Sequence, residues 1–361
     1  MARRWIVGRS GMEEKPVFYH CISRVVDRRF AFERDEKEKF RMFMRMYENF
    51  TGCRVVSYCL MSNHFHLLLE VPPLPEGGFS DAELLARLRA LYSEAVVAGV
   101  AKELADARDL GYQYQVEEIH ARFTRRMHDL SRFMEGLLQR FTRWFNRTQS
   151  RSGNLWEDAF KSVIVEDGVA ARTISAYIDL NPVRAGMVVD PADYRWSSYG
   201  EAMGGGARGN GKKARAGLVR ALMAHKGYEA DARHWAGRVS KNYRMMLLEA
   251  GEETLKEGVN AAGEREVKVL RKGMKKVVAA AELERLQRNR DVAVGKMLRC
   301  RIRYFTDGAV IGSRSFVNEA FESARSRFGP KRSSGARMLR GDASPAARAL
   351  WSFRDLKKDV G

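Results

Sequence analysis

The sequence predicts an α+β fold: an antiparallel sheet with helices on one face, followed by a mostly helical, basic C-terminal region. The first observation behind this prediction is that strand-like and helix-like segments interleave over the first 200 residues. The second is a change of composition near residue 201, where glycine, lysine and arginine become frequent. With 361 residues, of which 45% are hydrophobic, the chain is long enough for two or three domains and a sizeable core.

The expected strands alternate apolar and polar residues, or form short apolar runs between turn residues. They cover 16–26, 53–62, 64–71 and 155–167. The expected helices cover 33–50, 80–128, 129–149 and 168–181. The first helix carries apolar residues at helical spacing, namely Phe40, Phe43, Met44 and Tyr47. The last helix must end near Asn181, because Pro182 disfavours helical geometry in the residue before it.

The order strand–helix–strand–strand–helix–strand–helix resembles a split βαβ, ferredoxin-like sheet with its helices on one face. We therefore expect one domain at residues 1–200, with a helical insertion at about 77–128. A linker is expected at 201–217, because glycine and basic residues dominate there. Residues 218–361 are expected to form a basic, mainly helical accessory region that binds DNA.

The charge balance favours a polyanionic partner. Lysine and arginine number 64 against 45 aspartates and glutamates, which gives a formal net charge of +19. Such an excess is most often used to bind nucleic acid, although a merely soluble basic protein fits it as well. Residues 1–200 hold 29 basic and 27 acidic residues, whereas residues 201–361 hold 35 and 18. The second part therefore brings most of the attraction for phosphate, and in it we expect a turn at Asp307-Gly308 and a helix from about Ser315.

The four cysteines show neither a metal-binding nor a disulfide-framework spacing, so we expect free thiols in a reducing compartment. The sequence contains no run of about 18 apolar residues and no signal-peptide pattern. These features predict a cytoplasmic, nucleoid-associated protein without a membrane partner.

The segment "SYCLMSNHFHLLLEV" at 57–71 places His64 and His66 one residue apart on an expected strand. Side chains at i and i+2 of a strand share a face, so both imidazoles can converge on one metal ion. Phe65 then points the other way, into the core. The spacing alone is weak evidence, because two histidines on the wet face of a sheet can simply be solvated.

A candidate nucleophile and a third candidate ligand lie in "SAYIDLNPVRAGMV" at 175–188. Tyr177 and Asn181 are four residues apart, so they share one face of the expected helix. A tyrosine hydroxyl and an amide oxygen would then face the same ion. From these residues alone, Tyr177 is more often a core residue, and Asn181 equally serves as the cap of a helix that ends before Pro182.

Three blocks, in order, resemble the HUH single-strand DNA transposases that use one catalytic tyrosine, and among them the REP-associated tyrosine transposases. The blocks are "YCLMSNHFHLLLEV", "LSRFMEGLLQRFTRWFNRTQSRSGNLWEDAFKSVIVE" and "YIDLNPVRAGMVVDPADYRWSSY". The resemblance implies that His64 and His66 bind a divalent ion, Mg²⁺ or Mn²⁺. It also implies that Tyr177 is the nucleophile and that Asn181 completes the metal site.

The activity implied by this resemblance is metal-dependent DNA transposition. The enzyme would cleave and rejoin single-stranded DNA at hairpin-containing, REP-like sequences through a covalent 5′-phosphotyrosine, as a monomer or a homodimer. Arg24, Arg184 and Arg195 are the candidate phosphate contacts. Two alternatives remain: an HUH nicking enzyme of replication or plasmid transfer, and a catalytically inactive DNA-binding relative. The chain also has "LWEDAFKS" where relatives commonly have "LWQGRFKS", which removes a basic residue that could contact phosphate.

Three aromatic residues near these motifs have two interpretations. His20, on the first expected strand, is at least as readily a packing residue as a part of the site. Trp196 and Tyr199 could stack on bases, but burial against the helix of Tyr177 is favoured.

Overall fold

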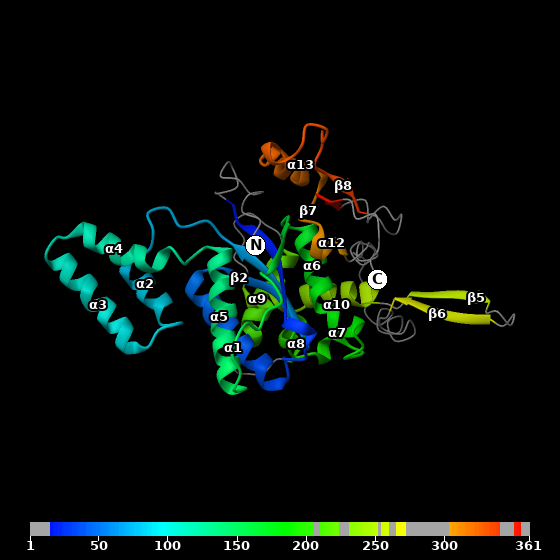
Figure 1. Ribbon diagram of the computed structural model, residues 1–361, viewed down its shortest axis with the longest axis horizontal. Helices are drawn as coiled ribbons and strands as arrows, with labels where there is room; N and C mark the ends of the chain where they lie inside the picture. The colour runs from blue at the N-terminus through cyan, green and yellow to red at the C-terminus, as the bar shows by residue number, and fades with distance from the viewer. Residues whose placement is uncertain are drawn as a thin grey trace.

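The computed structural model describes residues 15–204, 210–223, 231–251, 254–259, 265–271, 303–339 and 350–354. At the centre of these residues is a sheet of seven strands, in the spatial order β2-β3-β1-β4-β7-β9-β8. Neighbouring strands for which the register is given are antiparallel, except β4 and β7, which run parallel. The predicted α+β class and largely antiparallel sheet are confirmed, whereas the finer ferredoxin-like description stays a prediction (Figure 1).

The first part of the sheet and two long helices follow the predicted order closely. The strands are β1 (Val17–Arg24), β2 (Arg54–Leu60), β3 (His64–Val71) and β4 (Lys161–Val165). The helices are α1 (Arg34–Thr51) and α5 (Leu130–Thr148). β4 is shorter than expected because Trp156, inside the expected strand, forms an isolated bridge with Val25 instead of continuing the ladder with β1.

Successive residues of the central strands enter two cores, one on each face of the sheet. In β1, Tyr19 and Cys21 pack in the core under α1 and α5, whereas Phe18 packs in the opposite core. Helices of the second face are α6 (Val169–Asp179), α7 (Asn181–Arg184), α8 (Ser198–Met203), α9 (Asn210–Leu222) and α10 (Arg238–Gly251). The expectation of helices on one face therefore holds for α1 and α5 but not for α6, because the strands are apolar on both sides.

The expected insertion at 77–128 is helical and has a small core of its own (Figure 1). It consists of α2 (Asp81–Leu88), α3 (Glu94–Asp109) and α4 (Gln113–Thr124). A capping box begins α2, in which the Ser80 hydroxyl accepts from the Glu83 amide and the Glu83 carboxylate accepts from the Ser80 amide. Phe50, from the end of α1, joins this core and ties the insertion to the main body.

The C-terminal part of the chain returns to the main sheet. Its elements are α12 (Arg303–Asp307), β7 (Val310–Gly312), α13 (Arg314–Glu322), β8 (Arg337–Met338) and β9 (Trp351–Ser352). The expected helix begins at Arg314 after its N-cap Ser313, one residue before the predicted start. A separate hairpin comprises β5 (Thr254–Val259) and β6 (Arg265–Arg271). Short 3₁₀ turns lie at Val26–Arg28, Pro191–Asp193, Ala232–Trp235 and Arg325–Arg327.

The linker expected at 201–217 is in part a packed helix, because α9 begins at Asn210. Its apolar residues Ala214 and Leu218 are buried in the second core. A Cβ atom on Gly217 would lie 2.5 Å from the Val56 carbonyl oxygen of β2, so only glycine allows so close an approach. The basic residues that suggested a linker lie on the other side of this helix, where Lys213 contacts Asn49. The DNA-binding role of residues 218–361 stays a prediction.

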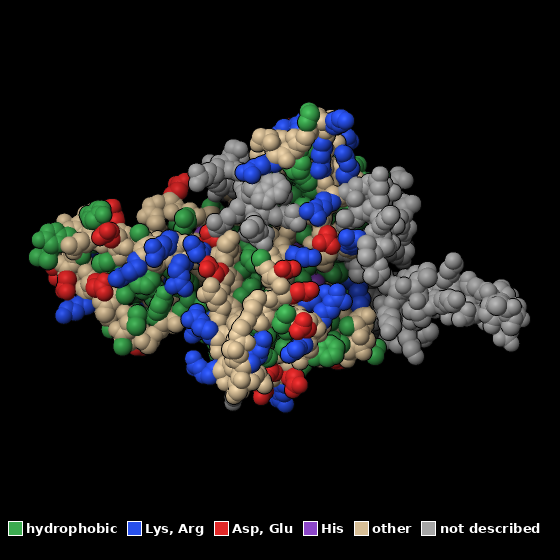
Figure 2. All heavy atoms as spheres, in the orientation of Figure 1, with side chains coloured by type: hydrophobic (Ala, Val, Ile, Leu, Met, Phe, Trp, Pro, Cys, Tyr) green, Lys and Arg blue, Asp and Glu red, His purple; other side chains and the backbone are tan. Residues whose placement is uncertain are grey.

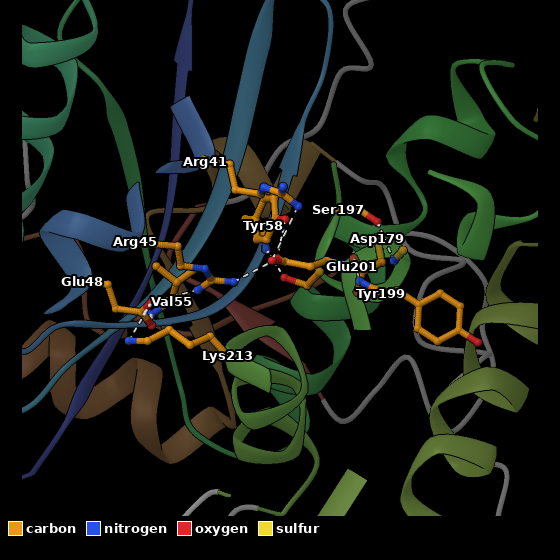
Figure 3. Close-up of polar contacts among 12 residues, drawn as sticks. Arg41, Arg45, Glu48, Val55, Tyr58, Asp179, Ser197, Tyr199, Glu201 and Lys213 are labelled. Carbon is orange, nitrogen blue, oxygen red and sulfur yellow. Dashed lines mark hydrogen bonds and ion pairs between the residues drawn. The ribbon is translucent and has the colours of Figure 1, made fainter. Parts of the chain in front are cut away.

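The outer edge of β2 is covered by the segment around α8. The Tyr58 amide donates to the Ser198 hydroxyl at 2.8 Å, and the Leu60 amide donates to the Trp196 carbonyl at 2.9 Å. Figure 3 shows the buried carboxylate of Glu201, which accepts from the Tyr58 phenol at 2.6 Å and from Arg45 at 3.1 Å. These contacts satisfy edge groups that would otherwise pair with another strand.

Among the described residues, Cys21, Cys53 and Cys59 are buried free thiols, as predicted, while Cys300 lies outside them. Across the same residues, none of the helices combines the length and the apolar character needed to cross a membrane.

Candidate active site

His64 and His66 share the face of β3 that α6 covers. Their ring centroids are 5.1 Å apart. The His66 ring is also 5.6 Å from the ring of Tyr177, with the two planes at 88°. His66 is 3% exposed and Tyr177 is 4% exposed, whereas Phe65 packs in the opposite core as predicted. His66 thus lies under a helix and not on a wet face, His64 is half-buried, and the predicted nucleophile lies beside His66.

The sequence around α6 explains how Tyr177 reaches this position. Gly168 precedes the helix with φ of 85°, a conformation that favours glycine. Ile174 and Tyr177 then fall on the apolar face that packs against the sheet. At the other end, the Asn181 amide group donates to the carbonyls of Tyr177 and Ile178, at 3.1 and 3.3 Å. Asn181 therefore caps α6, as one of the two interpretations predicted, and its role as a metal ligand stays a prediction.

Asp179 connects α6 to two other helices. Its carboxylate is buried and accepts from the Tyr199 amide at 2.9 Å and from the Tyr243 phenol at 2.6 Å. Figure 3 shows this carboxylate between α6 and the segment of α8. Burial raises the pKa of Asp179 to about 7, against the opposing effect of these hydrogen bonds. The helix that carries Tyr177 is thus anchored to both α8 and α10.

The electrostatic surroundings of Tyr177 combine burial with a nearby cation. Burial raises the pKa of its phenol above the usual value near 10. The Arg184 guanidinium, 5.1 Å from the centre of the phenol ring, acts in the opposite direction. The Phe305 ring of α12 lies 4.9 Å from the ring of Tyr177. At neutral pH the phenol is therefore protonated and needs help to become a nucleophile.

The donor set fits a divalent cation. Burial lowers the pKa of His64 to about 4 and lowers that of His66 well below its usual value, so both rings are neutral at pH 7, as a metal ligand must be. The Nδ1 atom of His64 contacts Asn63 Oδ1 at 2.7 Å, and that of His66 contacts His20 Nε2 at 3.1 Å. Within the described residues, no group of three or more His, Cys, Asp and Glu side chains has the arrangement of a metal site, so the metal centre stays a prediction.

The three predicted phosphate contacts lie in different places. Arg24 is paired with His64 in the register of β1 and β3, and Arg184 lies over the Tyr177 ring. Arg195 instead forms an ion pair with Glu38 of α1 at 2.6 Å. Arg195 therefore lies against α1 and Trp196, and of the three arginines Arg24 and Arg184 are the two that lie near the histidines and Tyr177.

His20, for which the sequence left packing and a role in the site both open, lies beside His66 and Tyr177. It is fully buried, stacks on His66 at 5.2 Å between ring centroids, and lies 5.9 Å from the ring of Tyr177. Its Nδ1 atom contacts the Phe305 carbonyl at 2.7 Å. The sequence contained one sign of this role, a polar residue in the middle of a largely apolar strand. His20 lies on the same side of β1 as Phe18.

The two aromatic residues considered for base stacking are structural. Tyr199 is fully buried beside Tyr243 and Trp235, as the favoured interpretation predicted. Trp196 is half-buried, packs against both cores and donates from its indole nitrogen to Glu38 at 3.0 Å.

Comparisons with known proteins give one family match and one similar solved structure. Residues 15–76 match the family of IS200-like transposases, a segment that contains β1, α1, β2 and β3 with both histidines. A solved structure of a REP-associated tyrosine transposase bound to a REP hairpin aligns with 60% of this chain and 90% of its own, at 11% identity and a TM-score of 0.33. No curated protein matches the chain. The family match confirms the predicted resemblance to a transposase over residues 15–76, which include the first of the three blocks.

Proposed function

We propose that this chain, an IS200-like transposase over residues 15–76, cleaves and rejoins single-stranded DNA with Tyr177 as its nucleophile. The family match supports the transposase function itself. The observation that carries the finer proposal is the 5.6 Å approach of the Tyr177 ring to His66 within one chain. Because Tyr177 lies outside the matched segment, this contact is independent of the match.

In the proposed cleavage, one phosphodiester linkage of DNA is exchanged for a phosphodiester linkage to Tyr177. The Tyr177 oxygen loses its proton and bonds to the phosphorus, while the bond from phosphorus to the 3′ oxygen breaks. The departing 3′ oxygen takes up a proton and becomes a hydroxyl, and the 5′ phosphate stays on tyrosine. Since a phosphodiester replaces a phosphodiester, the step is nearly balanced in energy and can reverse to rejoin DNA without a nucleotide cofactor.

His64 and His66, with Asn181, are the residues that would hold Mg²⁺ or Mn²⁺. Two neutral imidazoles and an amide oxygen suit such an ion and leave its charge unneutralised by the protein. When bound, the ion offsets the charge that develops on the phosphate oxygens. Arg184 supports the same reaction from the chain itself, because its guanidinium beside the phenol ring favours the phenolate.

The proposed partner is single-stranded DNA with a hairpin. Arg24 and Arg184 lie at the site to contact the cleaved phosphate. Figure 2 shows further lysine and arginine side chains over the part of the chain around α13, where residues 303–339 hold seven basic and three acidic residues. A basic surface of this kind suits the phosphates of a DNA stem, whose recognition is independent of base sequence.

DNA binding without cleavage is the alternative function, and one observation favours it. Tyr177 and His66 are almost completely buried, and Tyr304 and Phe305 of α12 pack over the same core. Cleavage therefore requires that DNA displace part of this cover. A protein that bound hairpins and never exposed Tyr177 would be an inactive relative. An HUH nicking enzyme of replication or plasmid transfer stays the other alternative.

The deciding experiment uses the full chain and a labelled single-stranded oligonucleotide that contains a hairpin and flanking sequence. With Mn²⁺ present, we expect a covalent protein–DNA adduct on a denaturing gel, and peptide mapping should place it on Tyr177. A chelator should abolish the adduct. Binding of the hairpin without any adduct, under conditions where Mn²⁺ is bound, would support the inactive relative.

A further inference from the structure

We propose that His20 and Asn63 are positioning residues that hold His66 and His64 in the tautomer that carries its proton on Nδ1. Both rings then present the lone pair of Nε2 to a divalent cation. This inference rests on the metal site of the proposed function and adds the residues that orient its ligands. Neither residue is offered as a ligand itself.

The tautomer of His66 depends first on a backbone carbonyl, that of Phe305. The Phe305 oxygen can only accept, so His20 Nδ1, 2.7 Å away, must donate a proton to it. His20 is fully buried, and burial disfavours the charged form of its ring. A neutral ring with its proton on Nδ1 has a lone pair and no proton on Nε2. The His66 Nδ1 atom lies 3.1 Å from that lone pair and must therefore donate. The proton of neutral His66 is thereby fixed on Nδ1.

For His64, a different set of atoms leads to the same tautomer. The Asn63 amide nitrogen donates to the Arg28 carbonyl at 3.0 Å, which settles the orientation of the amide. Its oxygen therefore faces His64 Nδ1, at 2.7 Å. Because an amide oxygen can only accept, the His64 proton is also on Nδ1. Two unrelated contacts thus select the same ring nitrogen for the proton in both histidines.

The tautomer decides which atom can bind a metal ion, because a neutral imidazole has one nitrogen lone pair and so one ligating atom. If either histidine took the other tautomer, its Nε2 atom would carry a proton and could not coordinate. Among the described residues, Nδ1 of both rings has a hydrogen-bond partner, whereas Nε2 of neither ring has one. The stacking of His20 on His66, with planes at 20°, also fixes the rotation of the ring. Partners of this kind typically change metal affinity by about 10- to 100-fold.

The test compares three variants of the full chain, His20→Leu, His20→Gln and Asn63→Ala, with His120→Leu as a matched control. His120 is a hydrogen-bonded, largely buried histidine of the insertion, whose partner is Asp81. The probe is Mn²⁺ alone, titrated by electron paramagnetic resonance. Side-chain ¹⁵N NMR of the apo protein reports the tautomers of His64 and His66 independently of metal and of DNA.

We expect wild type to show both histidines with the proton on Nδ1. His20→Leu should weaken Mn²⁺ binding by about 10- to 100-fold and release His66 into a mixture of tautomers. His20→Gln keeps an acceptor oxygen for His66, so it should recover affinity to within a few-fold of wild type. Asn63→Ala should have the corresponding effect on His64, and His120→Leu should leave Mn²⁺ affinity unchanged.

The inference is overturned if either wild-type histidine carries its proton on Nε2, a result that needs no variant to fold. It is also overturned if His20→Leu binds Mn²⁺ as tightly as wild type, or if His20→Gln is as weak as His20→Leu. Failure of the proposed function looks different, since Mn²⁺ would bind with the expected tautomers while no DNA adduct formed.

Discussion

The phenol ring of Tyr177 lies 5.6 Å from the imidazole ring of His66, between centroids, at almost a right angle. The two residues belong to α6 and β3, which pack against each other on one face of the sheet. The proposed nucleophile and a proposed metal ligand are therefore neighbours within a single chain. From this relationship follow predictions on catalysis, on the anchoring of α6, and on the number of chains that one site needs.

Replacing Tyr177 by phenylalanine should abolish the covalent adduct. The variant keeps the ring that packs against His66, His20 and Phe305, so the fold should be retained. It removes only the attacking oxygen, and loss of a nucleophile typically costs about a thousandfold or more. Adduct formation on a denaturing gel measures the effect, and circular dichroism checks the fold.

Tyr199→Phe is the matched control for that experiment. Tyr199 is also a buried tyrosine of the same core, and its contact with Asp179 uses the backbone amide, which the substitution leaves in place. This variant should form the adduct at nearly the wild-type rate. If Tyr177→Phe still forms as much adduct as Tyr199→Phe, another residue is the nucleophile.

The local part of this site could be predicted from the sequence, whereas its assembly could not. Strand spacing alone places His64 and His66 on one face, and helix spacing places Tyr177 and Asn181 on one face. The partner of His20 is the carbonyl of Phe305, which lies 285 residues away in the chain. Local patterns contain no information on a contact of that separation.

Asp179→Ala should destabilise the protein by about 2–5 kcal/mol, because it leaves the buried Tyr199 amide and Tyr243 phenol without an acceptor. Urea unfolding measures this change. The variant should also slow adduct formation, since α6 loses its anchor to α8 and α10. Tyr243→Phe removes one donor and leaves the carboxylate paired with Tyr199, so it should cost only about 1 kcal/mol. Equal losses in the two variants would contradict the anchoring role of Asp179.

Gly217→Ala should destabilise the packing of α9 on β2. The new methyl group would lie 2.5 Å from the Val56 carbonyl oxygen and 2.6 Å from that of Val55. Overpacking against backbone typically costs about 1–3 kcal/mol, which thermal unfolding can detect. Gly99→Ala is the control, because Gly99 is exposed within α3 with open space around it, and alanine there should stabilise by up to about 1 kcal/mol.

The composition of α9 led to the prediction of a linker where the structure has a helix. Glycine, lysine and arginine are typical of linkers, and the segment 211–217 reads "GKKARAG". The structure shows that these residues have two faces, with Ala214 and Gly217 turned to the sheet and Lys213 turned to α1. Likewise β7 has only three residues, too few for a pattern, and its place beside β4 is set by tertiary pairing.

The carboxyl group of Asp81 should titrate well below its usual range. Arg108 donates to both of its oxygens and His120 contacts one of them, so the pKa of Asp81 falls from 3.8 to about 2. Because folding lowers this pKa, the ionised Asp81 carboxylate stabilises the folded state. This stabilisation is complete above about pH 4 and is lost as the pH falls through about 2. The pair is partly exposed, so its contribution should be about 1 kcal/mol or less.

A ¹³C NMR titration of the Asp81 carboxyl group measures this pKa directly. Arg108→Ala should raise the midpoint toward 3.8, because the first cause of the shift is removed. The difference in unfolding free energy between wild type and Asp81→Asn should shrink on acidification below pH 4. A midpoint near 3.8 in the wild-type protein would show that the ion pair does not form in solution.

The last prediction concerns how many chains build one active site. His66, Tyr177 and His20 contact one another within a single chain. The β2 edge is covered by Trp196 and Ser198, so that edge is not open to a second copy. A mixture of a His64→Ala/His66→Ala chain with a Tyr177→Phe chain should therefore form no more adduct than either chain alone. If two chains shared each site, random pairing would restore about a quarter of the wild-type sites. Mixing wild type with the Tyr177→Phe chain controls for dilution, and light scattering gives the mass of each species. Recovery near a quarter, from particles of dimer mass, would show that Tyr177 acts on the histidines of a partner.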